Sequence, residues 1–247
     1  MITMRTIKLT IEYDGTDYAG WQVQDNGLGV QQVVEEALAN ILGTRVRLYS
    51  SGRTDAGVHA KGMVAAFRTD RDIPLSAFSD GVNCHLPQDI AVKSAEEAPP
   101  GFDPRRDATG KHYRYTILNT QRRSPLSRLY AWHLKGMLDL DLMRGAARHM
   151  VGEKDFAAFR TSGCAAITTV RTVFSVDITR DGEFIVIDVK GSGFLRNMVR
   201  IMVGTMVQAG EGKIPPDAIP SFFEGKTGST AGMTAPAHGL CLVEVYY

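Results

Sequence analysis

Residues Ser51–Ala60 read SGRTDAGVHA, and no other stretch of the 247 residues groups so many reactive side chains. Two glycines flank the triplet at 53–55, so the backbone can turn sharply there. Alternating residues predict a strand at 44–49, and an apolar run predicts another at 62–67. We therefore expect a loop held between two strands, a common position for catalytic groups.

Asp55 is the central candidate in this loop. An aspartate has a reference pKa of about 3.9, so at neutral pH it can act as nucleophile, base or electrostatic partner. The planar fork of Arg53 can hold that carboxylate or a phosphate. The alternative is a turn in which Asp55 only accepts backbone N–H groups and Arg53 is solvated.

The first half of the chain predicts strands and one clear helix. Strict alternation at 7–13 predicts a half-buried strand, and apolar residues three and four apart within 29–42 predict an amphipathic helix that ends at Gly43. A second helix is expected at 75–82 and a strand at 90–94. The polar loop at 14–22 carries two aromatic residues, which either stack on bases or anchor the loop to the core.

The second half repeats this order after a Pro/Gly boundary at 98–101. The patterns predict, in sequence order, a strand at 112–119, a helix at 138–151, a hairpin at 170–179 and 184–190, a helix at 194–209 and a strand at 240–246. The expected fold class is α+β, with two ferredoxin-like (RRM-like) halves whose antiparallel sheets form one central sheet with helices on one side. The expected domains are 1–103, which carries the Asp55 loop, and 104–247.

The charge of the chain is balanced overall but uneven along its length. Lys and Arg total 28 and Asp and Glu total 27. The resulting net charge of +1 does not by itself predict a polyanionic partner. Residues 80–103 hold five carboxylates and one lysine, net −4, whereas 104–128 hold seven cations and one carboxylate, net +6. This change of sign suggests a basic face for phosphates, although a solvated charged surface explains most such runs.

Cysteine and histidine spacing predicts neither a disulfide framework nor a metal site. Cys84, Cys164 and Cys241 are odd in number and form no C-x-x-C pair, and the six histidines are scattered. We expect no metal, no cofactor and a reducing cytoplasmic location. The chain has no signal-peptide pattern and no run of about 18 apolar residues, so we expect no membrane association.

The Asp55 loop resembles the signature loop of the tRNA pseudouridine synthase A (TruA) family. Further blocks resemble that family in the same order along the chain: Tyr13–Thr16, Gly20–Gln22, Asn83 with Leu86-Pro87, Asp89–Val92, Phe102 with Arg105, Tyr113–Tyr115, Asp155-Phe156 with Phe159-Arg160, and Met198–Arg200 with Val203-Gly204. The resemblance implies an intramolecular transferase that isomerises uridine to pseudouridine in the anticodon stem-loop of tRNA, at positions 38, 39 and 40, without cofactor. It also implies a homodimer and an RNA-binding active-site cleft.

The resemblance assigns roles residue by residue. Asp55 matches the catalytic aspartate, and Arg53 is the candidate to hold the flipped-out nucleotide. Tyr113 matches the active-site tyrosine, and Arg200 matches an arginine that would pair with the Asp55 carboxylate and keep it ionised. Arg105, Arg114 and Arg123 are candidates for RNA contacts.

Two alternatives remain open at the level of sequence. A non-catalytic RNA-binding module with paired ferredoxin-like sheets would need the arginines but not Asp55. A hydrolase acting on glycosidic bonds would need a second placed carboxylate, and none is evident beside Asp55.

Overall fold

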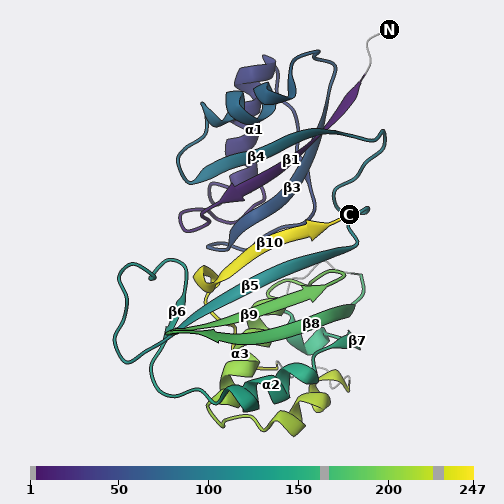
Figure 1. Cartoon of the computed structure of the whole chain (residues 1–247). Helices are drawn as coiled ribbons and strands as arrows, with labels where there is room; N and C mark the ends of the chain where they lie inside the picture. Colours follow the sequence, from purple (N-terminus) through teal and green to yellow (C-terminus); the bar gives the residue numbers. More distant parts are fainter. Residues whose placement is uncertain (1–3, 162–166, 225–230) are drawn as a thin grey trace. The chain divides into compact units, whose positions relative to one another are not determined.

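A computed structural model describes residues 4–161, 167–224 and 231–247 (Figure 1). Residues 1–3 and Cys164, which entered the arguments about export and cysteine pairing, lie outside these ranges. The chain separates into two compact units, Met1–Thr109 with Leu242–Tyr247, and Gly110–Cys241. Both units contain antiparallel sheets and helices, so the predicted α+β class is confirmed.

The division between the units differs from the one expected from composition. The sequence placed it between residues 103 and 104, whereas the units divide between Thr109 and Gly110, and Leu242–Tyr247 belongs to the first. The last strand, β10 (Leu240–Tyr246), lies beside β3 (His59–Thr69). The pairing of β10 with β3 assigns Leu242–Tyr247 to the first unit, and a Pro/Gly-rich stretch at residues 98–101 cannot predict such a pairing. The separate roles assigned to the two domains stay a prediction.

The first unit has the strand order of a ferredoxin-like fold. β1 (Arg5–Tyr13) lies between β3 and β4 (Ile90–Ala98), and the short β2 (Tyr49–Ser50) pairs with β3, all antiparallel. The predicted alternation of β1 is confirmed by its fully buried Ile7, Leu9 and Ile11. α1 (Val30–Leu42) lies on one face of this sheet (Figure 1) and ends at Gly43, which adopts a left-handed φ of 71°.

The predicted strand at 44–49 is wrong for most of its length. Only Tyr49 and Ser50 pair with β3. The backbone of Leu48 is bound instead by the side chains of α1: its N–H donates to Glu35 Oε1 at 2.8 Å, and its carbonyl accepts from Gln31 Nε2 at 3.1 Å. Because helix side chains satisfy these groups, the segment needs no strand partner.

The helix predicted at 75–82 is confirmed in a modified form. Residues 75–83 are helical, with a π-helical turn at Ala77–Gly81 that packs on α1 and on β4. Phe78 in this turn is fully buried and meets Phe67 of β3 edge to face at 5.4 Å. The turn therefore closes one end of the core of the first unit.

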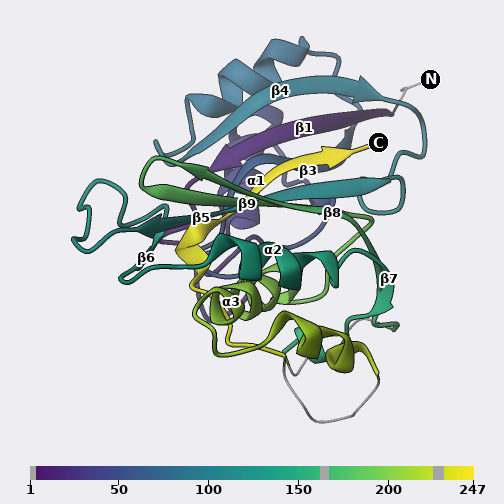
Figure 2. The same cartoon turned by 60° about the horizontal axis from the view of Figure 1, so that its bottom comes forward.

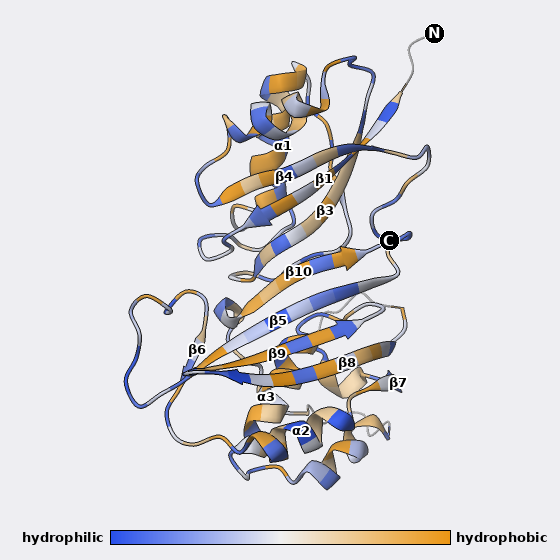
Figure 3. Cartoon of the chain, in the orientation of Figure 1, coloured by the Kyte–Doolittle hydropathy of each residue, from blue (hydrophilic) through white to orange (hydrophobic). Residues whose placement is uncertain are grey.

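The second unit repeats the order of strand, helix, hairpin and helix. Its sheet runs β5 (Gly110–Asn119), β9 (Phe184–Gly191), β8 (Val170–Asp181), β7 (Gly152–Asp155), and the short β6 (Trp132–Leu134) pairs with β5 in parallel. α2 (Leu140–Arg148) and α3 (Met198–Gly210) pack together on one face of this sheet (Figure 2). β8 and β9 alternate in hydropathy along their length (Figure 3), as half-buried strands should.

The methionine-rich stripe of α3 packs in the core. Met198, Met202 and Met206 are fully buried. The helix begins at Met198 and not at 194, because Asn197 has a left-handed φ of 60° and cannot continue a helix backwards. Short 3-10 turns complete the unit at Ala157–Phe159, Pro216–Phe223 and Ala237–Gly239.

Candidate active site

The Asp55 loop joins β2 to β3, and backbone contacts fix it in place. Ser51 N–H donates to the Val64 carbonyl at 2.8 Å, which starts the loop on β3. Trp21 N–H donates to the Thr54 carbonyl at 3.1 Å, and the Thr54 hydroxyl lies 2.7 Å from the Tyr13 hydroxyl. The residue immediately before Asp55 is therefore held by two different segments of the first unit.

Two glycines of the 14–22 loop allow that loop to press against the Asp55 loop. A Cβ on Gly15 would lie 2.1 Å from the Val58 carbonyl oxygen. A Cβ on Gly20 would lie 2.5 Å from the Thr54 carbonyl oxygen, and Gly20 also has a φ of 102°. Neither approach is possible with a side chain, so both glycines are needed for this geometry.

Asp55 lies in a tight backbone turn. Val58 N–H donates to the Asp55 carbonyl at 3.1 Å, and Gly57 adopts a φ of 75° that closes the turn. The Asp55 residue is partly exposed, and Arg53 is exposed. Hydrogen bonds thus fix the backbone of this turn, while Arg53 is exposed and Asp55 is partly exposed.

The neighbouring His59, Tyr18 and Trp21 support the loop. Gly15 N–H donates to His59 Nδ1 at 3.1 Å, and the same nitrogen lies 3.0 Å from Asp14 Oδ1, so His59 joins the 14–22 loop to the Asp55 loop. Tyr18 and Trp21 are buried, so they anchor the 14–22 loop in the core and offer no stacking surface to bases. Burial, reinforced by the Tyr18 hydrogen bond to Asp89, raises the pKa of the Tyr18 phenol above its ordinary value.

Tyr113 lies on β5 in the second unit. Its residue is 8% exposed, and its ring meets the Phe194 ring edge to face at 5.3 Å. Tyr113 and Tyr115 share the buried side of β5, because residues two apart on a strand point to the same face. Most of the Tyr113 ring is therefore packed against the protein.

Arg200, on the first turns of α3, has a fixed guanidinium. Its Nε donates to the Ala235 carbonyl at 2.7 Å, and its Nη1 donates to Asn197 Oδ1 at 2.7 Å. Asn197 in turn donates from Nδ2 to Thr161 Oγ1 at 3.0 Å. The left-handed conformation of Asn197 thus places an amide between Arg200 and the segment that precedes residue 162.

The same short segment that binds Arg200 also binds Tyr115. Tyr115 donates to the Pro236 carbonyl at 2.8 Å, one residue after the carbonyl that accepts from Arg200. Burial raises the pKa of the Tyr115 phenol above its ordinary range, and the positive charge of Arg200 opposes that shift. Arg200 and Tyr115 are therefore close neighbours within the second unit.

The predicted site residues divide between the two units. Asp55 and Arg53 belong to the first unit, together with the exposed Arg105, and Tyr113 and Arg200 belong to the second. Their assembly into one cleft stays a prediction.

Arg114 and Arg123, the remaining predicted RNA contacts, have different surroundings in the second unit. Arg114 binds Asp188 through two hydrogen bonds, of 2.9 and 3.0 Å, and Asp188 also lies 2.6 Å from His112 Nε2. Burial alone would raise the pKa of Asp188, but the hydrogen bonds from Arg114 and His112 lower it below its ordinary value. Arg123 has no such carboxylate partner in the described residues, so its charge is the more available for a phosphate.

Sequence reasoning missed the residues that position the charged groups. Gly15 and Gly20 appeared only as parts of a matched block, and Asn197 was placed inside a helix. A glycine pair in a polar loop is the signal that could have indicated close backbone contact. No sequence signal separates a left-handed Asn from a helical one.

No group of three or more His, Cys, Asp or Glu side chains within residues 4–161, 167–224 and 231–247 has the arrangement of a metal site. Over the same ranges, no helix has the length and apolar character of a membrane span.

Comparison with known proteins gives consistent matches. A family model described as tRNA pseudouridine synthase matches residues 9–105 and 146–247. The tRNA pseudouridine synthase A of Geobacter sulfurreducens is 64% identical over 244 residues, which cover 99% of this chain and 100% of that protein. The proteins of the same name from Geotalea uraniireducens and Acetivibrio thermocellus are 62% and 47% identical, again over 99% of this chain and 100% of theirs.

Proposed function

This chain belongs to the tRNA pseudouridine synthase family and converts uridine to pseudouridine in tRNA, and we propose that it does so in the anticodon stem-loop with Asp55 as its catalytic carboxylate. The observation that supports Asp55 most strongly is the clamped loop: its backbone is fixed on both sides, while the Asp55 residue stays partly exposed. A reacting group needs this combination of fixed position and access.

The isomerisation defines what the carboxylate must do. The bond between uracil N1 and ribose C1′ breaks, the base turns, C5 bonds to C1′, the C5 hydrogen leaves as a proton, and N1 takes up a proton. Asp55 takes part either by attack on the ribose or the base or by removal of a proton.

Three further residues complete the proposed site. Arg200 pairs with the Asp55 carboxylate and keeps it ionised, which the two bonds that orient its guanidinium support. Arg53 holds the flipped-out nucleotide, and its exposure supports this role. Tyr113 lines the base pocket with the small exposed part of its ring.

The remaining assignments follow from the family and from charge. We propose that Arg105, Arg114 and Arg123 contact the RNA backbone, that the enzyme acts as a homodimer, and that it works in the cytoplasm, where its tRNA substrate is found. Arg123 should contribute more than Arg114, whose charge Asp188 already balances.

The test is release of tritium from tRNA labelled at C5 of uridine. Wild type should release tritium from unmodified tRNA, because the new bond to C5 expels that hydrogen. Asp55→Asn should bind the same tRNA with a similar Kd and release none. This separation of binding from turnover would identify Asp55 as the catalytic group.

Asp25→Asn is the matched control, since Asp25 is an exposed aspartate of the same unit outside the clamped loop. It should release tritium at the wild-type rate. Tritium release by Asp55→Asn at the wild-type rate would show that Asp55 is not the catalytic carboxylate. No turnover by wild type, together with tight tRNA binding, would favour the non-catalytic RNA-binding module.

A further inference from the structure

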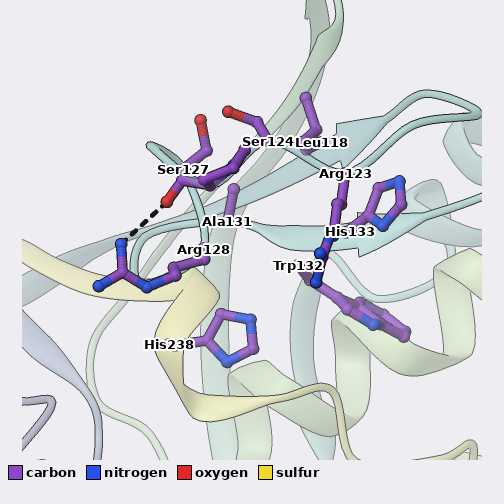
Figure 4. Close-up of a pocket in the computed structure, with 10 residues that line it drawn as sticks. Leu118, Arg123, Ser124, Ser127, Arg128, Ala131, Trp132, His133 and His238 are labelled. Atoms are coloured by element: carbon purple, nitrogen blue, oxygen red, sulfur yellow. Dashed lines mark hydrogen bonds between the residues drawn. The ribbon is translucent and has the colours of Figure 1, made fainter.

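A pocket in the second unit contains none of the proposed active-site residues. It has a volume of about 470 Å³ and is formed by the β5–β6 connection at 120–131, by β6, and by the turn at Ala237–Gly239 (Figure 4). The family model leaves residues 106–145 unmatched, so it covers neither the connection nor β6. The relatives nevertheless align over almost the whole chain.

The polar lining of this pocket is basic. Arg123, Arg128, His133 and His238 line it, with no aspartate or glutamate among the lining residues. Two permanent guanidinium charges without a compensating carboxylate favour an anion, and the forked N–H groups of arginine match the oxygens of a phosphate.

The connection that carries the two arginines is preformed. Arg128 Nη1 donates to the Pro125 carbonyl at 2.9 Å, and Ala131 N–H donates to the Ser127 carbonyl at 3.0 Å. His133 Nε2 lies 2.9 Å from the Thr120 carbonyl and ties β6 to the start of the connection. A phosphate that binds Arg128 would therefore meet a guanidinium that is already oriented, which reduces the cost of ordering it.

Trp132 adds a flat aromatic surface to the same pocket. Its residue is partly exposed, and its ring meets the Tyr115 ring edge to face at 6.3 Å. Since Tyr115 is fully buried and bound to the Pro236 carbonyl, the position of the indole is supported from the core. An aromatic ring beside arginines is the combination that binds a nucleotide through its base and its phosphate.

We propose that this pocket is a second RNA-binding site, which takes two backbone phosphates of the tRNA, one on Arg123 and one on Arg128, and stacks an adjoining base on Trp132. The inference rests on the proposed function for the identity of the RNA. The pocket then contributes affinity and position for the tRNA, and it takes no part in breaking or forming the glycosidic bond.

The experiment measures the Kd of an unmodified tRNA transcript at several KCl concentrations for wild type, Arg123→Ala, Arg128→Ala and the double variant. Each lost phosphate contact should reduce the slope of log Kd against log[KCl] by about one. The double variant should therefore lose about two units of slope and bind roughly tenfold or more weakly at low salt. Arg123→Lys/Arg128→Lys should retain most of the slope, because lysine keeps the charge.

Arg148→Ala is the control, because Arg148 is an exposed arginine of the same unit on α2, outside the pocket. It should leave the slope unchanged. An equal loss of slope in this control would show that only total charge matters, and would overturn the proposal. An unchanged slope in the double variant would also overturn it.

Fluorescence tests the stacking directly, because the chain has only two tryptophans and the other one, Trp21, is buried. Quenching on tRNA binding should occur in wild type and be absent in Trp132→Phe. Quenching that persists in Trp132→Phe would show that no base stacks on Trp132.

If the double arginine variant changed only the self-association of the protein in sedimentation, the pocket would be a contact between copies of the chain, and the proposal would be overturned. Tritium release by wild type is measured in parallel. This result tests the proposed function independently of whether tRNA binds in the pocket.

Discussion

The Asp55 loop and the Arg200 side chain are held in different ways. Backbone contacts against glycines of a neighbouring loop hold the Asp55 loop, with no room for a Cβ at Gly15 or Gly20. Side-chain and carbonyl hydrogen bonds hold Arg200, through Asn197 and Ala235. A backbone clamp fails when an atom is added, whereas a side-chain clamp fails when a polar atom is removed. The two regions should therefore respond to opposite kinds of substitution.

The largest effect is expected from an added methyl group at Gly15. In Gly15→Ala the new Cβ would lie 2.1 Å from the Val58 carbonyl oxygen, so the backbone of the Asp55 turn must move. A displacement of about 1 Å at a reacting group costs about 100-fold in rate. We expect tritium release to fall by about that factor, while tRNA binding falls much less.

Gly81→Ala is the control for this prediction, since its Cβ would meet the nearest heavy atom, Ile41 Cδ1, at 3.4 Å, an ordinary contact. It should retain the wild-type rate. A Gly15→Ala enzyme with full activity would show that the clamp does not position Asp55.

An intermediate effect is expected when the Asn197 amide is removed. Asn197→Gly keeps access to the left-handed φ of 60° but removes the acceptor for Arg200 Nη1. A lost hydrogen bond to a charged group is worth about 1.5 to 3 kcal/mol, so we expect kcat to fall roughly tenfold or more, with a smaller change in KM.

Asn197→Asp retains the acceptor oxygen and should recover most of the rate. Circular dichroism and Tm measurements on both variants separate loss of position from loss of fold. If Asn197→Gly and wild type had equal kcat, the amide would have no positioning role for Arg200.

The smallest effect is expected at Asp188, which is held by side chains on β5 and takes no part in the proposed chemistry. Asp188→Asn weakens the bonds from Arg114 and His112, so the free energy of unfolding should fall by about 1 to 3 kcal/mol at neutral pH. The pKa of Asp188 is lowered in the folded state, so its stabilising contribution is present at neutral pH and is lost as pH falls through that lowered pKa.

Urea unfolding at several pH values checks this prediction. The difference between wild type and Asp188→Asn should be constant near neutrality and should shrink below a pH of about 4, where the unfolded carboxylate begins to take up protons. A difference that grows on acidification would contradict the assigned direction of the pKa shift.

Much of the fold could be predicted from the sequence because the strands and helices carry clear periodicity. The alternation of β1 and the helical spacing of α1 lead directly to the observed elements. The strand expected at 44–49 failed because Gln31 and Glu35 of α1 bind the Leu48 backbone, a contact that only folding creates. The start of α3 was misplaced because one residue, Asn197, leaves the helical region.

The sequence by itself determined the family, the α+β class and the candidate residues Asp55, Arg53, Tyr113 and Arg200, because residue types and their local spacing carry that information. Tertiary structure decided how the charged groups are held. The clamp on the Asp55 loop joins residues about forty positions apart, and the basic pocket joins the β5–β6 connection to the turn before β10. Such contacts depend on how backbone segments approach one another in the folded chain, which local periodicity does not specify.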